Sequence, residues 1–265
     1  NNNTGTIHLS NLCTEITLPE DEKNIATCNL VSINLSAFLG ADKTWDWQRL
    51  ESAVRSATRQ LDNLIDITNT PIPEAMRSNE LNRALGLGYM GLSDVLEKLE
   101  ISYESEAAYD LVDQLTEFIS FHAIDESANL AAERGSYPNF PGSGWSKGIL
   151  PIDTVDKLTT ERGVKVKIDS KSRLDWEVLR QKVKKGMRNA TLMAIAPTAN
   201  ISHVVGTTPG LDPQFSQIFS RSTLNGKFLE VNANLVRKLK ALGLWEELKD
   251  ELLTTQGDIQ HMKQI

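Results

Sequence analysis

Long stretches of this chain place apolar residues every three or four positions, and short β-branched or apolar stretches lie between them. The helical spacing occurs at residues 45–68, 91–100, 106–134, 175–187 and 230–254. Residues 25–35 are β-branched and nearly alternating, and residues 190–196 form a short apolar run, so both are predicted strands. Strands that alternate with helices predict an α/β fold.

The connecting segments carry their own signals. The sequence NTPIP at 69–73 ends the first long helix, and Gly135 is a typical stop for the helix at 106–134. Residues 136–150 are rich in glycine, proline and aromatic residues, which predicts a loop. Residues 155–172 are polar and charged, which predicts an exposed excursion.

Size and charge narrow the classes of function. The chain has 265 residues, enough for one large domain or two small ones, and its net charge of -7 argues against a nucleic-acid-binding face. It has no run of about 18 apolar residues, so no membrane span is expected. It begins without Met or a signal peptide, which predicts the cut or processed end of a longer protein. Two cysteines do not form a disulfide scaffold, which favours a reducing, cytoplasmic location.

Asn11, Cys13 and Glu15 are the first candidates for chemistry. On an extended segment, residues at i, i+2 and i+4 point to one side, so an amide, a thiol and a carboxylate would face one space. Such a set combines hydrogen bonding, sulfur chemistry and a general base. The alternative is a half-buried cysteine among ordinary polar neighbours, because a lone cysteine often behaves as a small hydrophobic residue.

Two other segments allow a structural and a functional interpretation. Cys28 lies on the predicted strand 25–35 and is a structural thiol unless it pairs with another sulfur. Residues 198–202 follow the predicted strand 190–196, and a helix beginning there would bind a phosphate through its free N–H groups. The same residue types also occur as simple helix caps.

The sequence GLGYMG at 86–91 fits the glycine pattern of dinucleotide-binding loops. That pattern requires a buried strand before it, whereas residues 78–83 are polar and helix-like. We therefore expect the glycines to let a helix pack closely against a neighbour. The four histidines show no metal-ligand spacing, so no metal site is expected in this chain.

Four segments together resemble one family. The segments SNLCTEI at 10–16, ALGLGYMGL at 84–92, KGILPIDT at 147–154, and MRNAT at 187–191 leading into APTA at 196–199 occur in the order found in the large, catalytic subunit of class I ribonucleotide reductases. In that family ALGLGYMGL corresponds to a glycine-rich helix. The cobalamin-dependent relatives more often have Asn-Pro-Cys-Gly-Glu at the cysteine, so the segment NLCTE favours class I.

The resemblance implies a fold. The family's catalytic domain is a ten-stranded α/β barrel made of two half-barrels, with the active-site cysteine on a finger loop at its centre. Residues 1–265 would be a fragment of that barrel domain, containing the loop and about the second half. An incomplete barrel leaves a sheet edge and apolar surface uncovered, so the isolated chain is expected to be poorly soluble or oligomeric.

The resemblance also implies residue roles in reducing a ribonucleoside diphosphate to its deoxy form. Cys13 would be the transient thiyl radical, Glu15 the base at the 3′ hydroxyl, and Asn11 a residue that orients the substrate. Cys28 would be one of two thiols that supply the reducing equivalents. The implied substrate-binding residues are Ser10, Asn11, Glu15, Pro197, Thr198, Ala199, Asn200 and Ile201.

The cofactor and partners follow from the same resemblance. No cofactor is expected on this chain, because the radical would come from a metal cofactor on a separate small subunit. Thioredoxin or glutaredoxin would restore the thiols, and the missing large-subunit segments would complete the enzyme; nucleic acid and membranes are not expected partners. The chain fits a split-gene product, an intein-related piece or an incomplete chain equally well. The alternatives are an inactive scaffold of the same fold and a cobalamin-dependent reductase.

Overall fold

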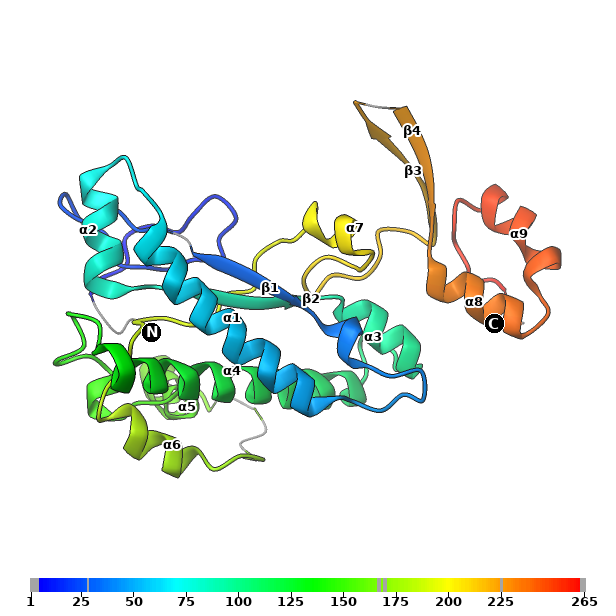
Figure 1. The fold of residues 1–265 in the computed structure, drawn as a ribbon. Helices are drawn as coiled ribbons and strands as arrows, with labels where there is room; N and C mark the ends of the chain where they lie inside the picture. The colour runs from blue at the N-terminus through cyan, green and yellow to red at the C-terminus, as the bar shows by residue number, and fades with distance from the viewer. Residues whose placement is uncertain (1–4, 28, 166–167, 169–170, 225, 263–265) are drawn as a thin grey trace.

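The computed structural model describes residues 5–27, 29–165, 168, 171–224 and 226–262 (Figure 1). The α-helices are α1 (Trp47–Ile67), α2 (Pro73–Asn82), α3 (Leu92–Leu99), α4 (Glu106–Arg134), α5 (Thr154–Arg162), α6 (Trp176–Val183), α7 (Ile201–Val205), α8 (Ala233–Ala241) and α9 (Trp245–Thr254). The strands are β1 (Leu30–Asn34), β2 (Gly86–Met90), β3 (Ile218–Thr223) and β4 (Gly226–Val231).

The central sheet is parallel. Strand β1 pairs with β2 in a register that places Leu30 opposite Gly86. An extended segment after residue 190 runs along the other edge of β2, where Leu87 and Met193 form a parallel bridge. The Ala194 N–H donates to the Leu87 carbonyl at 3.0 Å. The strand expected at 25–35 is therefore confirmed in a shorter form, as β1. The strand expected at 190–196 is an extended segment that joins β2 through the bridge between Leu87 and Met193.

The glycine-rich segment 86–91 does not form the expected helix, because its first five residues are strand β2. All five are buried, and the glycines serve a close approach between backbones. A Cβ atom on Gly88 would lie 2.3 Å from the carbonyl oxygen of Ala194, a distance that real side chains do not reach. A side chain at this position would separate β2 from the extended segment that pairs with it.

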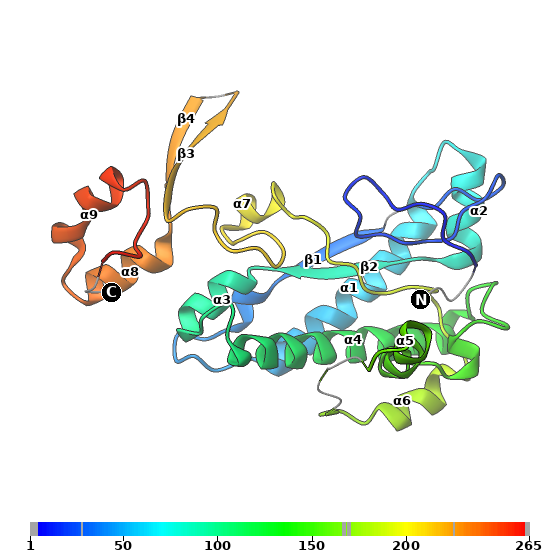
Figure 2. The same ribbon diagram turned by 180° about the vertical axis from the view of Figure 1, so that it is seen from behind.

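Helices α1 and α4 cover one face of the sheet (Figures 1 and 2). Leu87 and Tyr89 of β2 are buried in one core with residues of both helices, and the Tyr89 hydroxyl is 2.9 Å from Thr116 Oγ1 of α4. The helices expected at 45–68 and 106–134 are confirmed as α1 and α4, and the α4 C-cap is Gly135 as expected.

A second core lies where α6 and the loop after α4 meet α1. Trp145 and Leu150 of the loop pack there with Leu179 of α6. The loop expected at 136–150 is confirmed, apart from one turn of 3-10 helix at Trp145–Lys147. Most described residues of the expected excursion at 155–172 are exposed and none is buried, but helix α5 covers its first part, which the sequence pattern does not predict.

The last part of the chain extends away from the helix layer. Strands β3 and β4 form an antiparallel hairpin, and α8 and α9 pack together around Leu239 and Leu248. The single helical region expected at 230–254 is wrong in two respects: its first two residues belong to β4, and Gly243, at φ +74°, lies in the turn between the two helices.

The described residues thus form a mixed α/β structure, as expected, and no closed barrel is formed within them. No helix in this described part is both long enough and apolar enough to span a membrane.

Candidate functional site

The segment that carries Cys13 turns instead of running straight. The Thr14 N–H donates to the Asn11 carbonyl at 3.0 Å, and Thr14 has a positive φ of 63°. The Asn11 side-chain oxygen accepts a hydrogen bond from the Ile16 N–H at 3.0 Å. Of the two conformations that the sequence allows at 11–15, a short strand or a loop, the structure has the loop, because the asparagine stabilises a local turn through its own side chain.

Two of the candidate residues on this turn are open to solvent. Ser10 and Cys13 are exposed, Cys13 carries a free thiol, and Asn11 and Glu15 are half-buried. One carboxylate oxygen of Glu15, Oε2, is buried without a hydrogen-bond partner among the described residues. Buried polar atoms are nearly always paired. This oxygen is an exception, an acceptor that no described residue uses. The remaining candidate, Cys28, lies outside the described residues.

The Cys13 turn belongs to a loop on the sheet face away from α1 and α4 (Figures 1 and 2). Leu87 and Tyr89 point toward the helices, so Gly86 and Gly88 lie on the opposite face of β2. Ile16 is buried there, and a Cβ atom on Gly86 would lie 3.5 Å from its Cδ1 atom. Because Gly86 has no side chain, Ile16 can pack against this position and anchor the loop.

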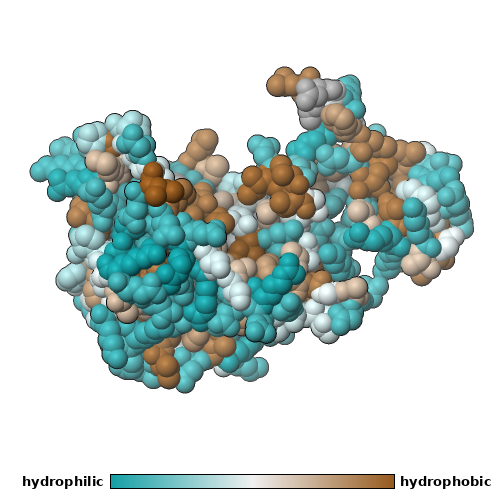
Figure 3. Space-filling view, viewed as in Figure 1, coloured by the Kyte–Doolittle hydropathy of each residue, from teal (hydrophilic) through white to brown (hydrophobic). Residues whose placement is uncertain are grey.

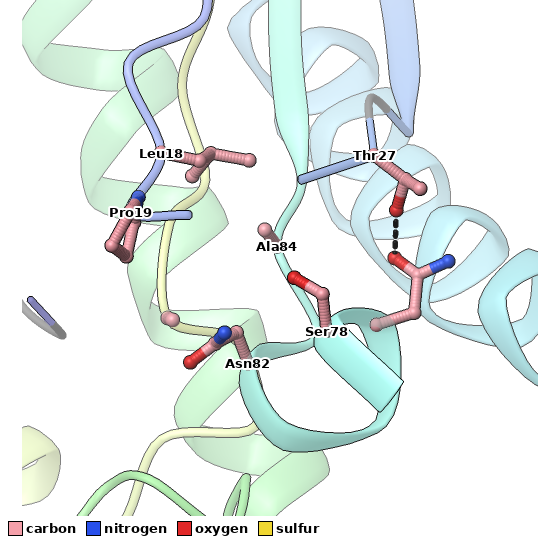
Figure 4. A pocket seen from close by; sticks show the side chains of 8 residues that line it. Leu18, Pro19, Thr27, Ser78, Asn82 and Ala84 are labelled. Atoms are coloured by element: carbon pink, nitrogen blue, oxygen red, sulfur yellow. Dashed lines mark hydrogen bonds between the residues drawn. The ribbon is translucent and has the colours of Figure 1, made fainter. Parts of the chain in front are cut away.

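A small cavity lies between the end of this loop and the start of the sheet (Figure 4). The Thr27 hydroxyl donates to Asn79 Oδ1 at 2.5 Å, and the Asn29 amide donates to the same oxygen at 3.0 Å. The cavity volume is about 10 Å³, room for one water molecule and no more. Its lining residues are Leu18, Pro19, Thr27, Ser78, Asn79, Asn82, Ala84 and Ala190. A nucleotide does not fit in this space.

The second candidate segment leads into helix α7, which confirms that a helix begins after residue 200. Thr198 is buried, its hydroxyl accepts a hydrogen bond from the Gly210 N–H at 2.9 Å, and its carbonyl accepts one from the Ser202 N–H at 2.9 Å. The other candidate residues of this segment are exposed; they are Pro197, Ala199, Asn200 and Ile201. Figures 1 and 2 place α7 and the Cys13 loop on the same side of the sheet.

Sequence reasoning did not single out Asp94, in the first turn of α3. It is buried, and its carboxylate accepts hydrogen bonds from Thr207 and Thr208, which follow α7. The available signal was an aspartate directly after an apolar, glycine-rich stretch. Within the described part of the chain, no three His, Cys, Asp or Glu side chains gather as metal ligands.

Comparison with known proteins decides the family. The family profile described as "Ribonucleotide reductase, barrel domain" matches residues 1–265. The chain belongs to the ribonucleotide reductase family. This membership confirms the resemblance to the class I large subunit that the four sequence segments indicated.

Several curated relatives support the same assignment. The "Ribonucleoside-diphosphate reductase subunit alpha" of Chlamydia pneumoniae is 44% identical to this ribonucleotide reductase chain, over 98% of the chain and 25% of its own length. The large subunit from Danio rerio is 36% identical and the large chain from Cryptosporidium parvum is 38% identical, each over 99% of this chain and 32% of its own length. The chain therefore spans about a quarter to a third of these relatives.

Proposed function

We propose that this chain is the cysteine-bearing portion of a larger catalytic subunit that reduces ribonucleoside diphosphates to deoxyribonucleoside diphosphates, the precursors used in DNA replication. The observation that carries this proposal is the family match over residues 1–265, which includes the segment NLCTE. The relatives are named ribonucleoside-diphosphate reductases, and the chain carries Asn11, Cys13, Glu15 and Cys28, four of the residues that the resemblance assigns to their reaction.

In the proposed reaction, a thiyl radical at Cys13 takes the 3′ hydrogen of the ribose, so an S–H bond forms as the C–H bond breaks. The Glu15 carboxylate takes the proton of the 3′ hydroxyl, which helps the 2′ hydroxyl leave as water. Two thiols, one of them Cys28, then become a disulfide: together they supply the proton with which the 2′ hydroxyl leaves as water, a hydrogen atom to C2′ and an electron to C3′, while Glu15 returns its proton to the 3′ oxygen. Cys13 then returns a hydrogen atom to C3′ and is again a radical. Asn11 and Ser10 bind the substrate beside these groups.

Two features of the turn at Cys13 support these roles. The Cys13 thiol is free and exposed, so a substrate and a radical path can both reach it. Glu15 Oε2 has no donor among the described residues, and a carboxylate oxygen without donors is available to take a proton. The Asn11 side chain braces the turn through Ile16, which would hold Cys13 and Glu15 in fixed relation.

The substrate diphosphate would bind at Pro197, Thr198, Ala199, Asn200 and Ile201. The first N–H groups of a helix have no partner within the helix, and they attract anions. At α7 the exposed Ile201 carries one of these groups, whereas the N–H of the buried Ser202 is bonded to the Thr198 carbonyl. The Thr198 hydroxyl, also buried, holds the segment in place through Gly210. Such a site needs no lysine or arginine.

The proposed enzyme is an assembly of which this chain forms one part. The parallel sheet around β2 would be part of a ten-stranded barrel, with the Cys13 loop as its central finger and the remaining large-subunit segments completing it. A separate small subunit would generate the radical at its metal cofactor, and thioredoxin or glutaredoxin would reduce the disulfide in a cytoplasmic setting.

The test is turnover of a ribonucleoside diphosphate by the complete large subunit with its small subunit, comparing the parent with Cys13→Ser. Turnover in the parent that is lost in Cys13→Ser supports the proposal. The exposed Thr14→Ser on the same turn is the matched control and should keep most activity. Substrate binding without any turnover in the assembled parent would favour an inactive scaffold. A requirement for adenosylcobalamin would favour the cobalamin-dependent class.

A further inference from the structure

Asp94 connects the segment after α7 to the end of strand β2. Its Oδ2 atom accepts hydrogen bonds from the Thr207 hydroxyl at 2.7 Å and from the Thr208 N–H at 2.6 Å. Its Oδ1 atom accepts one from the side-chain amide of Asn234 at 3.0 Å. Three neutral donors thus satisfy a carboxylate that is only 9% exposed, and two of them belong to one short segment.

Gly91 holds the same segment from a second direction. Its N–H donates to the Thr208 carbonyl at 2.9 Å, and its φ of +81° lies in the region that favours glycine. A Cβ atom on Gly91 would lie 2.3 Å from the Thr207 hydroxyl oxygen. Residues 207–208 therefore lie directly against the turn that joins β2 to α3.

Hydrogen bonds continue from this segment to the proposed diphosphate site. The Thr207 N–H donates to the Ser202 carbonyl at 2.9 Å, and the Ser202 N–H donates to the Thr198 carbonyl at 2.9 Å. The Gly210 N–H donates to the Thr198 hydroxyl and closes the loop from its other end. A displacement of residues 207–208 would therefore move Thr198 and the first turn of α7.

Strand β2 consequently carries both halves of the proposed site. Ile16, from the Cys13 loop, packs over Gly86 at its first residue, and residues 207–208 are held at Gly91, just after its last. Five residue steps of a strand span about 17 Å. The strand fixes the separation between the Cys13 loop and the α7 segment only while the α7 segment stays attached to its end.

We propose that Asp94 is a positioning residue that holds the 198–208 segment at the end of β2, and thereby sets where the substrate diphosphate binds relative to Cys13. This inference rests on the proposed function, since it assumes that the diphosphate binds at 198–201. Asp94 itself does not touch the substrate in this proposal; it acts through Thr207 and Thr208.

The test uses the complete large subunit with its small subunit and measures the KM and kcat for a ribonucleoside diphosphate. Thr207→Val keeps the shape of the side chain but removes the hydrogen bond to Asp94. We expect KM to rise about tenfold, as the loss of one hydrogen bond to a charged group would give, with a smaller change in kcat. Thr207→Ser keeps the hydroxyl and should restore a KM close to that of the parent.

Asn234→Ala is the matched control, because it removes the other hydrogen bond to the same carboxylate but leaves residues 207–208 attached. Its KM should equal that of the parent. KM does not depend on how much of the protein is folded, so partial unfolding of a variant lowers the apparent kcat and leaves the comparison intact. An unchanged KM in Thr207→Val, or an equal rise in Asn234→Ala, would overturn the role of Asp94.

Ala199→Asp separates this inference from the function on which it rests. A new negative charge at the proposed diphosphate site should raise KM strongly by repulsion. If Ala199→Asp raises KM and Thr207→Val does not, the diphosphate site stands and the role of Asp94 is wrong. If Ala199→Asp leaves KM unchanged, the diphosphate binds elsewhere and both assignments are wrong.

Discussion

The carboxylate of Asp62 is buried at the point where four parts of the chain meet. Its Oδ1 atom accepts hydrogen bonds from Arg83 Nε at 2.8 Å and from the Asn189 amide at 3.1 Å. Its Oδ2 atom accepts from Arg134 at 3.1 Å and from Arg188 at 3.3 Å. One side chain of α1 thus joins the C-cap of α2, the end of α4 and the segment that leads to the extended residues paired with β2.

We predict that Asp62→Ala lowers the free energy of unfolding by about 3–5 kcal/mol, because it removes a fully buried carboxylate that is bonded to three guanidinium groups and one amide. Chemical denaturation of the large subunit would measure this loss. Asp66→Ala is the control: Asp66 also binds Arg83, but its side chain is half exposed, so a loss of about 1 kcal/mol or less is expected. Equal losses in the two variants would contradict the prediction.

Glu117 of α4 holds the start of α6 in a comparable way. Burial raises the pKa of its carboxyl group, but hydrogen bonds from the Trp176 ring, the Arg173 backbone and side chain, and the Leu174 N–H outweigh burial. Its pKa therefore lies below the ordinary value of 4.5. The stability that Glu117 contributes is fully present above pH 4.5 and is lost as the pH falls through the lower, folded-state pKa.

We predict that Glu117→Gln is less stable than the parent at pH 7 and loses less stability between pH 7 and pH 3. Urea denaturation at a series of pH values would measure both effects. Trp176→Phe, which removes only the ring donor, should bring the pKa of Glu117 closer to its ordinary value and give an intermediate profile. Parallel profiles for the parent and Glu117→Gln would show that this carboxylate does not set the acid sensitivity.

At the scale of elements, the sequence predicts the helices and strands whose bounds are set by local signals. Helix α4 is predicted over its full length, because the apolar period continues throughout and Gly135 ends it; in the structure Ser105 caps its start. Strand β2 is mistaken for a helix, because its conformation depends on a close backbone approach between residues far apart in the chain. No local pattern contains that contact.

The hairpin and the turn at Cys13 are two further cases. The β3–β4 hairpin is not predicted although Asn-Gly at 225–226 is a strong hairpin signal, and the helical region expected at 230–254 overlaps the last two residues of β4. At Cys13 the sequence allows a short strand or a loop, and the loop forms because the Asn11 side chain bonds to the backbone of Ile16. The residue types of the candidate site were found from sequence, but their roles came from the family resemblance.

We predict that Gly88→Ala destabilises the fold by about 1–3 kcal/mol, because the added methyl group meets the Ala194 carbonyl at the centre of the sheet. Thermal and urea denaturation would measure the change. Ser32 lies opposite Gly88 on β1, and Ser32→Ala adds no atom to the sheet. That control should change stability by about 0.5 kcal/mol or less, and a Gly88→Ala variant as stable as this control would contradict the packing argument.

At the scale of the whole molecule, the hairpin and α7 expose apolar surface (Figure 3). Phe228 and Leu229 of β4 are 52% and 61% exposed, and Leu224 and Phe215 are more exposed still. A two-stranded hairpin is marginally stable without a covering layer. The expected association of the isolated chain can therefore be assigned to the exposed apolar surface of the hairpin and α7.

We predict that the isolated chain forms oligomers, and that the double variant Phe228→Lys with Leu229→Lys shifts it toward a monomer, because added charge opposes pairing of exposed strands. Light scattering would measure the mass against that of one 29.4 kDa chain. Leu242→Lys with Leu253→Lys changes two residues of similar exposure outside the hairpin and should not have this effect. A monomeric parent would contradict the prediction.

The parallel sheet also has a consequence for how the protein is made. The hydrogen bond between Thr191 and Leu85 spans 106 positions of the chain. A ribosome must therefore synthesise the whole of α3 to α6 before β2 gains its second neighbour. Domains fold as units during synthesis, and contacts between distant residues form slowly. Until then the loop that carries Cys13 rests on an unfinished sheet, so a pause in translation after α4 would leave this loop without its full support.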